Sequence, residues 1–133
     1  MSQENVEVVQ RCLAAFNAHD ITGWSSFLDS EFELVDHMAA VGEDVVSGIE
    51  ATRRQLEGWF DAFPDFRAET EEFIDAGNRV VCVTRWRGTG AASGLLYDQA
   101  AAEVFTVRQG KIVNAELGFD NRASALKAAG LAE

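Results

Sequence analysis

The chain of 133 residues is 47% hydrophobic, enough for one globular domain with a sizeable core and too short for two. Its 22 acidic and 11 basic residues give a formal net charge of -11, which argues against nucleic-acid and membrane partners because it repels phosphate groups. The start of the chain lacks a basic, apolar signal sequence, and no stretch approaches the ~20 apolar residues of a membrane helix. We therefore expect a single domain over residues 1–133, located in the cytoplasm.

The first half of the chain predicts three helices and one strand. Apolar residues at helical spacing over 3–18 predict an amphipathic helix, and Asp20 is placed to cap a short second helix. Residues 31–38 then alternate like a half-buried strand. The capping-box pattern "SGIE" predicts a third helix over 47–63, which ends before a proline.

The second half changes to a period of two, which is typical of strands. Residues 66–74 and 79–88 flank the turn sequence "DAGN" and predict a long hairpin. A glycine-rich connection leads to strands near 98–108 and 111–119, and a short helix follows from about residue 121. This order predicts an α+β fold in which helices pack on one face of a largely antiparallel sheet.

Two strands place an acid among apolar residues. Counting by twos along 31–38 groups four residues on one face: Phe32, Leu34, Asp36 and Met38. The same count along 98–108 groups Ala101, Glu103, Phe105 and Val107. Because burying an unpaired carboxylate costs several kcal/mol, one shared apolar pocket is the simplest explanation for both acids. Two alternatives stay open: a bulge that carries Asp36 to water, and ion pairs with Arg53, Arg85 or Arg87.

Other reactive residues carry no recognisable motif. Cys12 and Cys82 lack metal-type spacing and are expected to be small buried side chains, and His19 and His37 are isolated. We therefore predict no metal site.

Several segments together resemble a known family. These are "VVQRCLAAFNAHD", the strand ending "VDH", "SGIEATRRQL", "FIDAGNRVVCVTRWRGTG" and "VFTVRQGKIVNAEL". In order and spacing they resemble the SnoaL-like group of the nuclear transport factor 2-like superfamily, which includes ketosteroid isomerase and polyketide cyclases. The resemblance implies a cone-shaped, curved, mostly antiparallel sheet wrapped around N-terminal helices, the cystatin-like α+β arrangement, with an apolar cavity at its open end.

The resemblance also implies roles for individual residues. Asp36 matches the general base of ketosteroid isomerase, and Glu103 matches its protonated acid. Cys12 occupies the place of the family's tyrosine, and a thiol is only a weak hydrogen-bond donor. The implied substrate contacts are Cys12, Phe16, Trp59, Phe63, Trp86 and Phe105.

These features predict a domain that binds or transforms a small apolar or ring-containing molecule. The expected reaction is a cofactor-free isomerisation or cyclisation that begins with proton abstraction next to a carbonyl. The alternatives are a non-catalytic binding module for an apolar ligand and a dimeric interaction domain. A homodimer through the sheet is expected, with Val81 and Val83 considered for its surface.

The sequence leaves four further side chains open. Tyr97 either reaches the pocket or lies in an exposed loop, and His37 is expected to point away from Asp36. Asn114 and Glu116 line either the cavity or the outer surface of the sheet.

Overall fold

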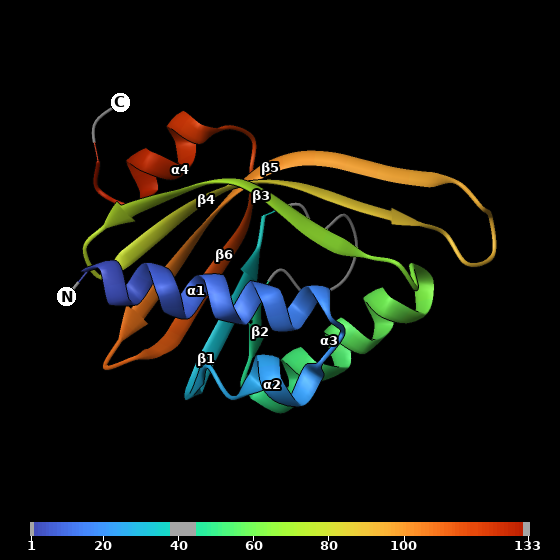
Figure 1. Cartoon of the computed structure of the whole chain (residues 1–133), viewed down its shortest axis with the longest axis horizontal. Coiled ribbons are helices and arrows are strands. Elements are labelled where there is room, and N and C mark those ends of the chain that lie inside the picture. Colours follow the sequence, from blue (N-terminus) through green and yellow to red (C-terminus); the bar gives the residue numbers. More distant parts are fainter. Residues whose placement is uncertain (1, 38–44, 132–133) are drawn as a thin grey trace.

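The computed structural model describes residues 2–37 and 45–131 (Figure 1). Within these residues the helices are α1 (Ser2–Asn17), α2 (Ile21–Ser25), α3 (Ile49–Ala62) and α4 (Arg122–Ala128). The strands are β1 (Leu28–Asp36), β2 (Val45–Ser47), β3 (Arg67–Ala76), β4 (Arg79–Thr89), β5 (Leu96–Arg108) and β6 (Lys111–Phe119).

The strands form one curved six-stranded sheet in the order β2-β1-β6-β5-β4-β3. The β1–β6 pair is parallel and the other neighbours are antiparallel. Helices α1, α2 and α3 lie on one side of the sheet, and α4 packs on the other (Figure 1). This arrangement confirms the predicted α+β fold with a mostly antiparallel sheet around the N-terminal helices.

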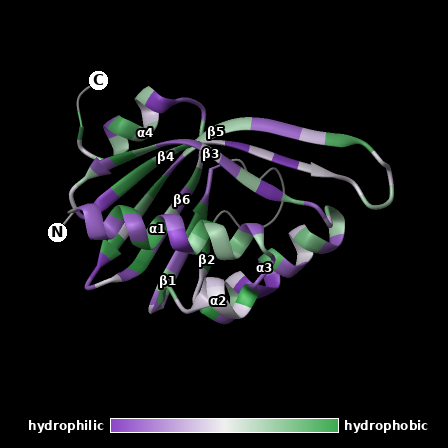
Figure 2. Ribbon diagram, in the orientation of Figure 1, coloured by the Kyte–Doolittle hydropathy of each residue, from purple (hydrophilic) through white to green (hydrophobic). Residues whose placement is uncertain are grey.

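The main core lies between the first three helices and the inner face of the sheet. Helix α1 contributes the apolar residues that its helical spacing predicts, namely Val6, Val9, Leu13 and Phe16. Strand residues Phe32, Leu34, Phe105 and Ile112 meet them from the sheet. Figure 2 shows the corresponding alternation of apolar and polar segments along α1 and the strands. The inner faces deduced by counting in twos are therefore confirmed.

A second, smaller core lies on the outer face of the sheet. There α4 covers Val81 of β4 together with Ala102 and Val104 of β5. Val81, which we considered for a dimer surface, is completely buried within the chain and is not exposed to a partner.

The start of α3 differs from the prediction. Ser47 is the last residue of β2, a strand that the sequence pattern did not reveal, and it pairs with Glu33 of β1. The cap position belongs to Gly48, whose φ of +89° favours glycine, and no side chain caps the helix. Ser47 is paired in the sheet, and the predicted capping box does not form. The cap of α2 is confirmed, because the Asp20 carboxylate accepts a hydrogen bond from the Gly23 amide at 2.9 Å.

Two strands begin earlier than predicted. Strand β1 begins at Leu28, and β5 begins at Leu96 because its pairing with β4 continues to the Thr89–Leu96 pair. The cross-strand ladder therefore places Tyr97 inside a strand. No helix in the described part of the chain is long and apolar enough to cross a membrane.

Candidate functional site

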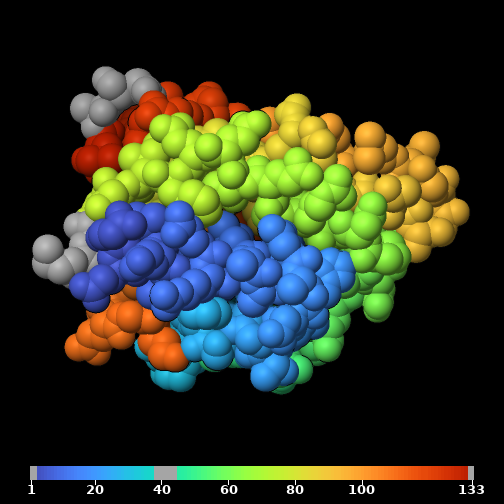
Figure 3. Space-filling view, viewed as in Figure 1, coloured from blue at the N-terminus to red at the C-terminus, as the bar shows by residue number. Residues whose placement is uncertain are grey.

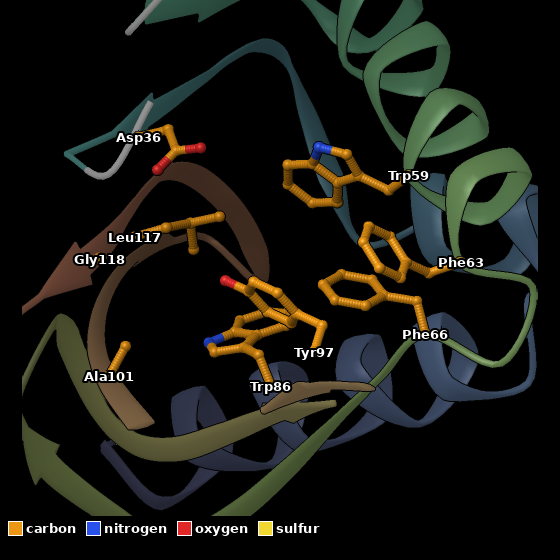
Figure 4. Close-up of a pocket in the computed structure, with 9 residues that line it drawn as sticks. All are labelled: Asp36, Trp59, Phe63, Phe66, Trp86, Tyr97, Ala101, Leu117 and Gly118. Carbon is orange, nitrogen blue, oxygen red and sulfur yellow. The ribbon is translucent and has the colours of Figure 1, made fainter. Parts of the chain in front are cut away.

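A cavity of about 230 Å³ opens between α3 and the inner face of the sheet (Figure 4). Its wall is mostly aromatic and aliphatic, and it is formed by Asp36, Trp59, Phe63, Phe66, Trp86, Tyr97, Ala101, Leu117 and Gly118. Such a wall favours an apolar ligand, with a few polar groups to orient it.

Asp36 reaches the cavity because it ends β1 on the inner face of the sheet. Phe32 and Leu34, four and two residues earlier, are buried in the core on that same face. Asp36 itself is half-buried and pairs in register with Leu117 of β6, another residue of the cavity wall. Met38, the fourth residue of the predicted face, lies outside the described residues.

His37 points to the opposite face, as the strand alternation predicts. Its Nε2 lies 3.7 Å from Oε1 of Glu116, and its ring packs against Phe119 with centroids 4.8 Å apart. Asn114 and Glu116 line a polar surface depression on the outer face of the sheet, together with Arg79 and Arg108. These side chains therefore take no part in the cavity.

Glu103 lies one layer behind the cavity wall. Its side chain is 1% exposed, and its Oε2 accepts a hydrogen bond of 3.0 Å from Nε1 of Trp86. Its Oε1 is buried and has no well-aligned hydrogen bond within the described residues. Burial raises the pKa of Glu103 to about 7, although hydrogen bonding by Thr84 and Trp86 acts in the opposite direction. A carboxyl with this pKa changes charge near neutral pH.

The two acids therefore do not share the wall of one cavity: Asp36 lines it, and Glu103 contacts the wall residue Trp86 from behind. Trp86 presents its ring to the cavity and donates its indole hydrogen to Glu103. The arginines that could have neutralised the acids have other ion-pair partners: Arg53 pairs with Glu50, Arg85 with Asp98, and Arg87 with Glu69 and Asp98.

A smaller apolar void of about 40 Å³ lies deeper in the core and shares Trp59, Trp86 and Leu117 with the cavity. Of the six predicted substrate contacts, Trp59, Phe63 and Trp86 line the cavity, whereas Cys12, Phe16 and Phe105 line this void.

The Cys12 thiol points toward the backbone of α2 and not into the cavity. It donates a hydrogen bond to the carbonyl oxygen of Trp24 at 3.8 Å, and burial raises its pKa to about 12. Cys12 is therefore a protonated, packed side chain.

Tyr97 lines the cavity and does not lie in an exposed loop. Its ring packs against Phe63 and Phe66, with centroids 5.6 and 6.0 Å apart. Its hydroxyl is directed toward the side of the cavity where Leu117 and Asp36 lie (Figure 4). Burial, followed by the negative charge of Asp36, raises the pKa of the phenol, so it stays protonated at neutral pH. Counting back by twos from Ala101 reaches Tyr97 on the inner face only because β5 begins at Leu96, two residues before the predicted start of the strand.

Metal-ligating groups do not converge within residues 2–37 and 45–131. The described residues contain no cluster of three or more histidine, cysteine or acidic side chains with the spacing of a metal site.

Comparisons with known proteins identify the family. Residues 9–115 match the model of the SnoaL-like domain. None of the curated proteins compared with the chain matches it.

Solved structures share the fold along most of the chain. A protein described as a SnoaL-like polyketide cyclase from Jannaschia sp. CCS1 is 23% identical with a TM-score of 0.76, over 86% of this chain and 84% of that one. TerC, co-crystallised with polyporic acid, is 25% identical with a TM-score of 0.77, over 88% and 92% of the two chains. A nuclear transport factor 2-like protein from Burkholderia pseudomallei K96243 is 20% identical with a TM-score of 0.77, over 93% and 95%. With the family match spanning both β1 and β5, the chain belongs to the SnoaL-like domain family and has the nuclear transport factor 2-like fold.

Proposed function

We propose that this protein transfers a proton next to the carbonyl group of a small, apolar, ring-containing molecule, without a cofactor. The observation that supports this proposal is the position of Asp36, a carboxylate on the wall of a cavity otherwise lined by aromatic and aliphatic groups. An apolar surrounding strengthens the interaction of a carboxylate with a bound substrate, because little water competes for it. In an unsaturated ketone, return of the proton to a different carbon would move the carbon–carbon double bond and so isomerise the molecule.

In this proposal Asp36 is the general base and Tyr97 is the hydrogen-bond donor. Asp36 removes a proton from the carbon next to the carbonyl, and the electron pair moves onto the carbonyl oxygen as an enolate. The neutral hydroxyl of Tyr97, directed toward the same side of the cavity, donates a hydrogen bond to that oxygen (Figure 4). Glu103 acts through Trp86, whose indole it holds, and is a positioning residue.

The aromatic wall favours flat or ring-shaped substrates. Trp59, Phe63, Phe66 and Trp86 offer ring faces and edges to a bound molecule. The co-crystallisation of TerC with polyporic acid supports a small organic ligand for this fold.

The experiment is hydrogen–deuterium exchange of a cyclic ketone in D₂O, followed by proton NMR. Asp36→Asn keeps the side-chain size but removes the base, and we expect exchange to fall by about 10² to 10⁴-fold. Tyr97→Phe is expected to slow it by about 10²-fold, because one oxyanion donor is lost. Asp120→Asn, an exposed acid at the end of β6, is the matched control. Unchanged exchange in Asp36→Asn would refute the assignment.

A second candidate function is non-catalytic binding of the same class of molecule. Cys12 supports it, because this thiol stands where the family has a tyrosine and is hydrogen-bonded to the Trp24 carbonyl. A binding module would be stabilised by ligand according to RT ln(1 + [L]/Kd), equally in the original chain and in Asp36→Asn. Thermal stabilisation by a ring ketone that undergoes no exchange would favour this alternative.

We also propose that two copies associate through the outer face of the sheet. The part of that face outside α4 carries both signs of charge, with Arg79 and Arg108 among Glu31, Glu33 and Glu116. A two-fold contact brings the same patch against itself, so the arginines of one copy can meet the acids of the other.

A further inference from the structure

A second apolar groove, of about 420 Å³, lies where the β4–β5 hairpin passes the end of α3. Its lining comprises Asp61, Ala62, Phe63, Gly90, Ala91, Ala92, Ser93, Leu95, Leu96 and Tyr97. Phe63 and Tyr97 also line the cavity that contains Asp36, so the two spaces share a wall. The groove therefore adjoins the cavity at Phe63 and Tyr97.

The groove exposes two adjacent leucines to solvent. Leu95 is 72% exposed and Leu96 is 69% exposed, the two highest values among the large apolar side chains of the described residues. They lie at the start of β5, where the ribbon is coloured hydrophobic (Figure 2), on a hairpin that projects from one end of the molecule (Figure 3). Covering this surface would release water from apolar area.

Three hydrogen bonds tie the hairpin to the end of α3 and the segment that follows it. The Asp65 carboxylate accepts hydrogen bonds from the Thr89 amide at 2.6 Å and the Thr89 hydroxyl at 3.0 Å. The Ala91 amide donates to the carbonyl oxygen of Ala62, the last residue of α3, at 2.9 Å. These bonds place the groove beside the cavity before any ligand arrives, which lowers the entropy lost on binding.

We propose that this groove binds an uncharged apolar extension of the ligand whose carbonyl-bearing ring occupies the cavity. The cavity volume of about 230 Å³ is below the ~300–1,000 Å³ of typical ligand sites, so a ligand of that size range has to extend beyond it. The shared wall of Phe63 and Tyr97 leads such an extension into the groove. Asp61 and the net charge of -11 disfavour an anionic extension. The placement of the carbonyl-bearing ring in the cavity rests on the proposed function.

The test compares two ligands by isothermal titration calorimetry: 2-cyclohexenone, and the same ring carrying a hexyl chain. Asp36→Asn is the background, so that neither ligand turns over. We expect the hexyl chain to lower Kd by about 30- to 100-fold, since each of its six carbons, about half covered in an open groove, contributes about twofold. Adding Leu95→Ser and Leu96→Ser should reduce that gain to below about tenfold and leave the Kd of 2-cyclohexenone unchanged. Leu131→Ser, at another exposed leucine beyond α4, should keep the full gain.

An equal chain-length gain with and without Leu95 and Leu96 would overturn the proposal. The proposal would also be overturned if sedimentation showed that the two serine substitutions only convert a dimer to a monomer. A second copy of the chain would then occupy the groove. If Asp36→Asn leaves deuterium exchange unchanged while the chain-length gain still depends on the leucines, the proposed function fails and the groove stands.

Discussion

At the residue scale, Glu103 has the most unusual environment of the described acids. It is fully buried, its Oε2 accepts the Trp86 indole hydrogen, and burial raises its pKa to about 7. A carboxyl that holds its proton more tightly in the folded protein stabilises the fold at low pH. This stabilisation is lost as the pH rises from the usual pKa of 4.5 through about 7.

Glu103→Gln is therefore expected to stabilise the protein above pH 7. Glutamine keeps an acceptor for Trp86 but carries no charge, so the buried site no longer has to hold an ionised group. Below pH 4.5 the two proteins should have similar unfolding free energies, and above pH 7 the variant should gain on the order of 3 kcal/mol. Urea unfolding of both proteins at pH 4.5, 6 and 8 measures the difference in their unfolding free energies. The other titrating groups are the same in both proteins, so their contribution cancels in this difference. A constant difference across this range would contradict the prediction.

At the scale of elements, β4 passes unusually close to the corner between α3 and β3. A Cβ atom at Gly88 would lie 3.0 Å from Cβ of Phe63 and 3.1 Å from Cδ1 of Phe66. Both aromatic side chains form the cavity wall. The absence of a side chain at Gly88 therefore lets the strand and the aromatic corner approach each other, and it shapes the cavity.

Gly88→Ala is expected to lower the unfolding free energy by about 1–3 kcal/mol, as overpacking does, and to weaken ligand binding by displacing Phe63 or Phe66. Gly58→Ala is the matched control, since a Cβ at this exposed position in α3 has no atom within 4 Å. The control should gain about 0.5–1 kcal/mol from helix propensity. Thermal unfolding with and without ligand measures both effects, and equal stability of the two alanine variants would refute this account.

At the scale of the whole molecule, the two faces of the sheet differ in composition and in what covers them. The inner face carries the main core and the cavity, while the outer face is covered in part by α4 and is elsewhere polar. With a net charge of -11 per copy, association needs local charge pairing to overcome general repulsion. The basic residues Arg79 and Arg108 of the outer depression are placed to supply it.

We predict that Arg79→Glu with Arg108→Glu shifts a dimer to monomer in sedimentation velocity. Arg11→Glu with Arg54→Glu changes the net charge equally on the helices of the opposite face, at exposed positions, and should leave the dimer intact. Dissociation by both pairs to the same extent would indicate general repulsion, and a monomeric original chain would contradict the dimer altogether.

Much of the fold follows from local pattern. The spacing of Val9 and Leu13 predicts α1, and the alternation around Asp36 and Glu103 predicts which strand faces turn inward, because helix and strand periods are properties of the local backbone. The family resemblance then predicts the curved sheet, and the structure, with its similarity to solved nuclear transport factor 2-like proteins, confirms it. The sequence alone therefore determined the architecture and the inward direction of both acids.

Tertiary structure decided which inward residues meet. Glu103 lies behind Trp86, Cys12 turns to the Trp24 carbonyl, and Tyr97 enters the cavity because β5 extends to Leu96. These outcomes depend on the depth of each side chain in a curved sheet and on pairing between distant strands, and neither is encoded in a local period. The sequence could therefore point Asp36 toward a pocket, whereas only the folded chain could place the phenol of Tyr97 on the wall of the same cavity.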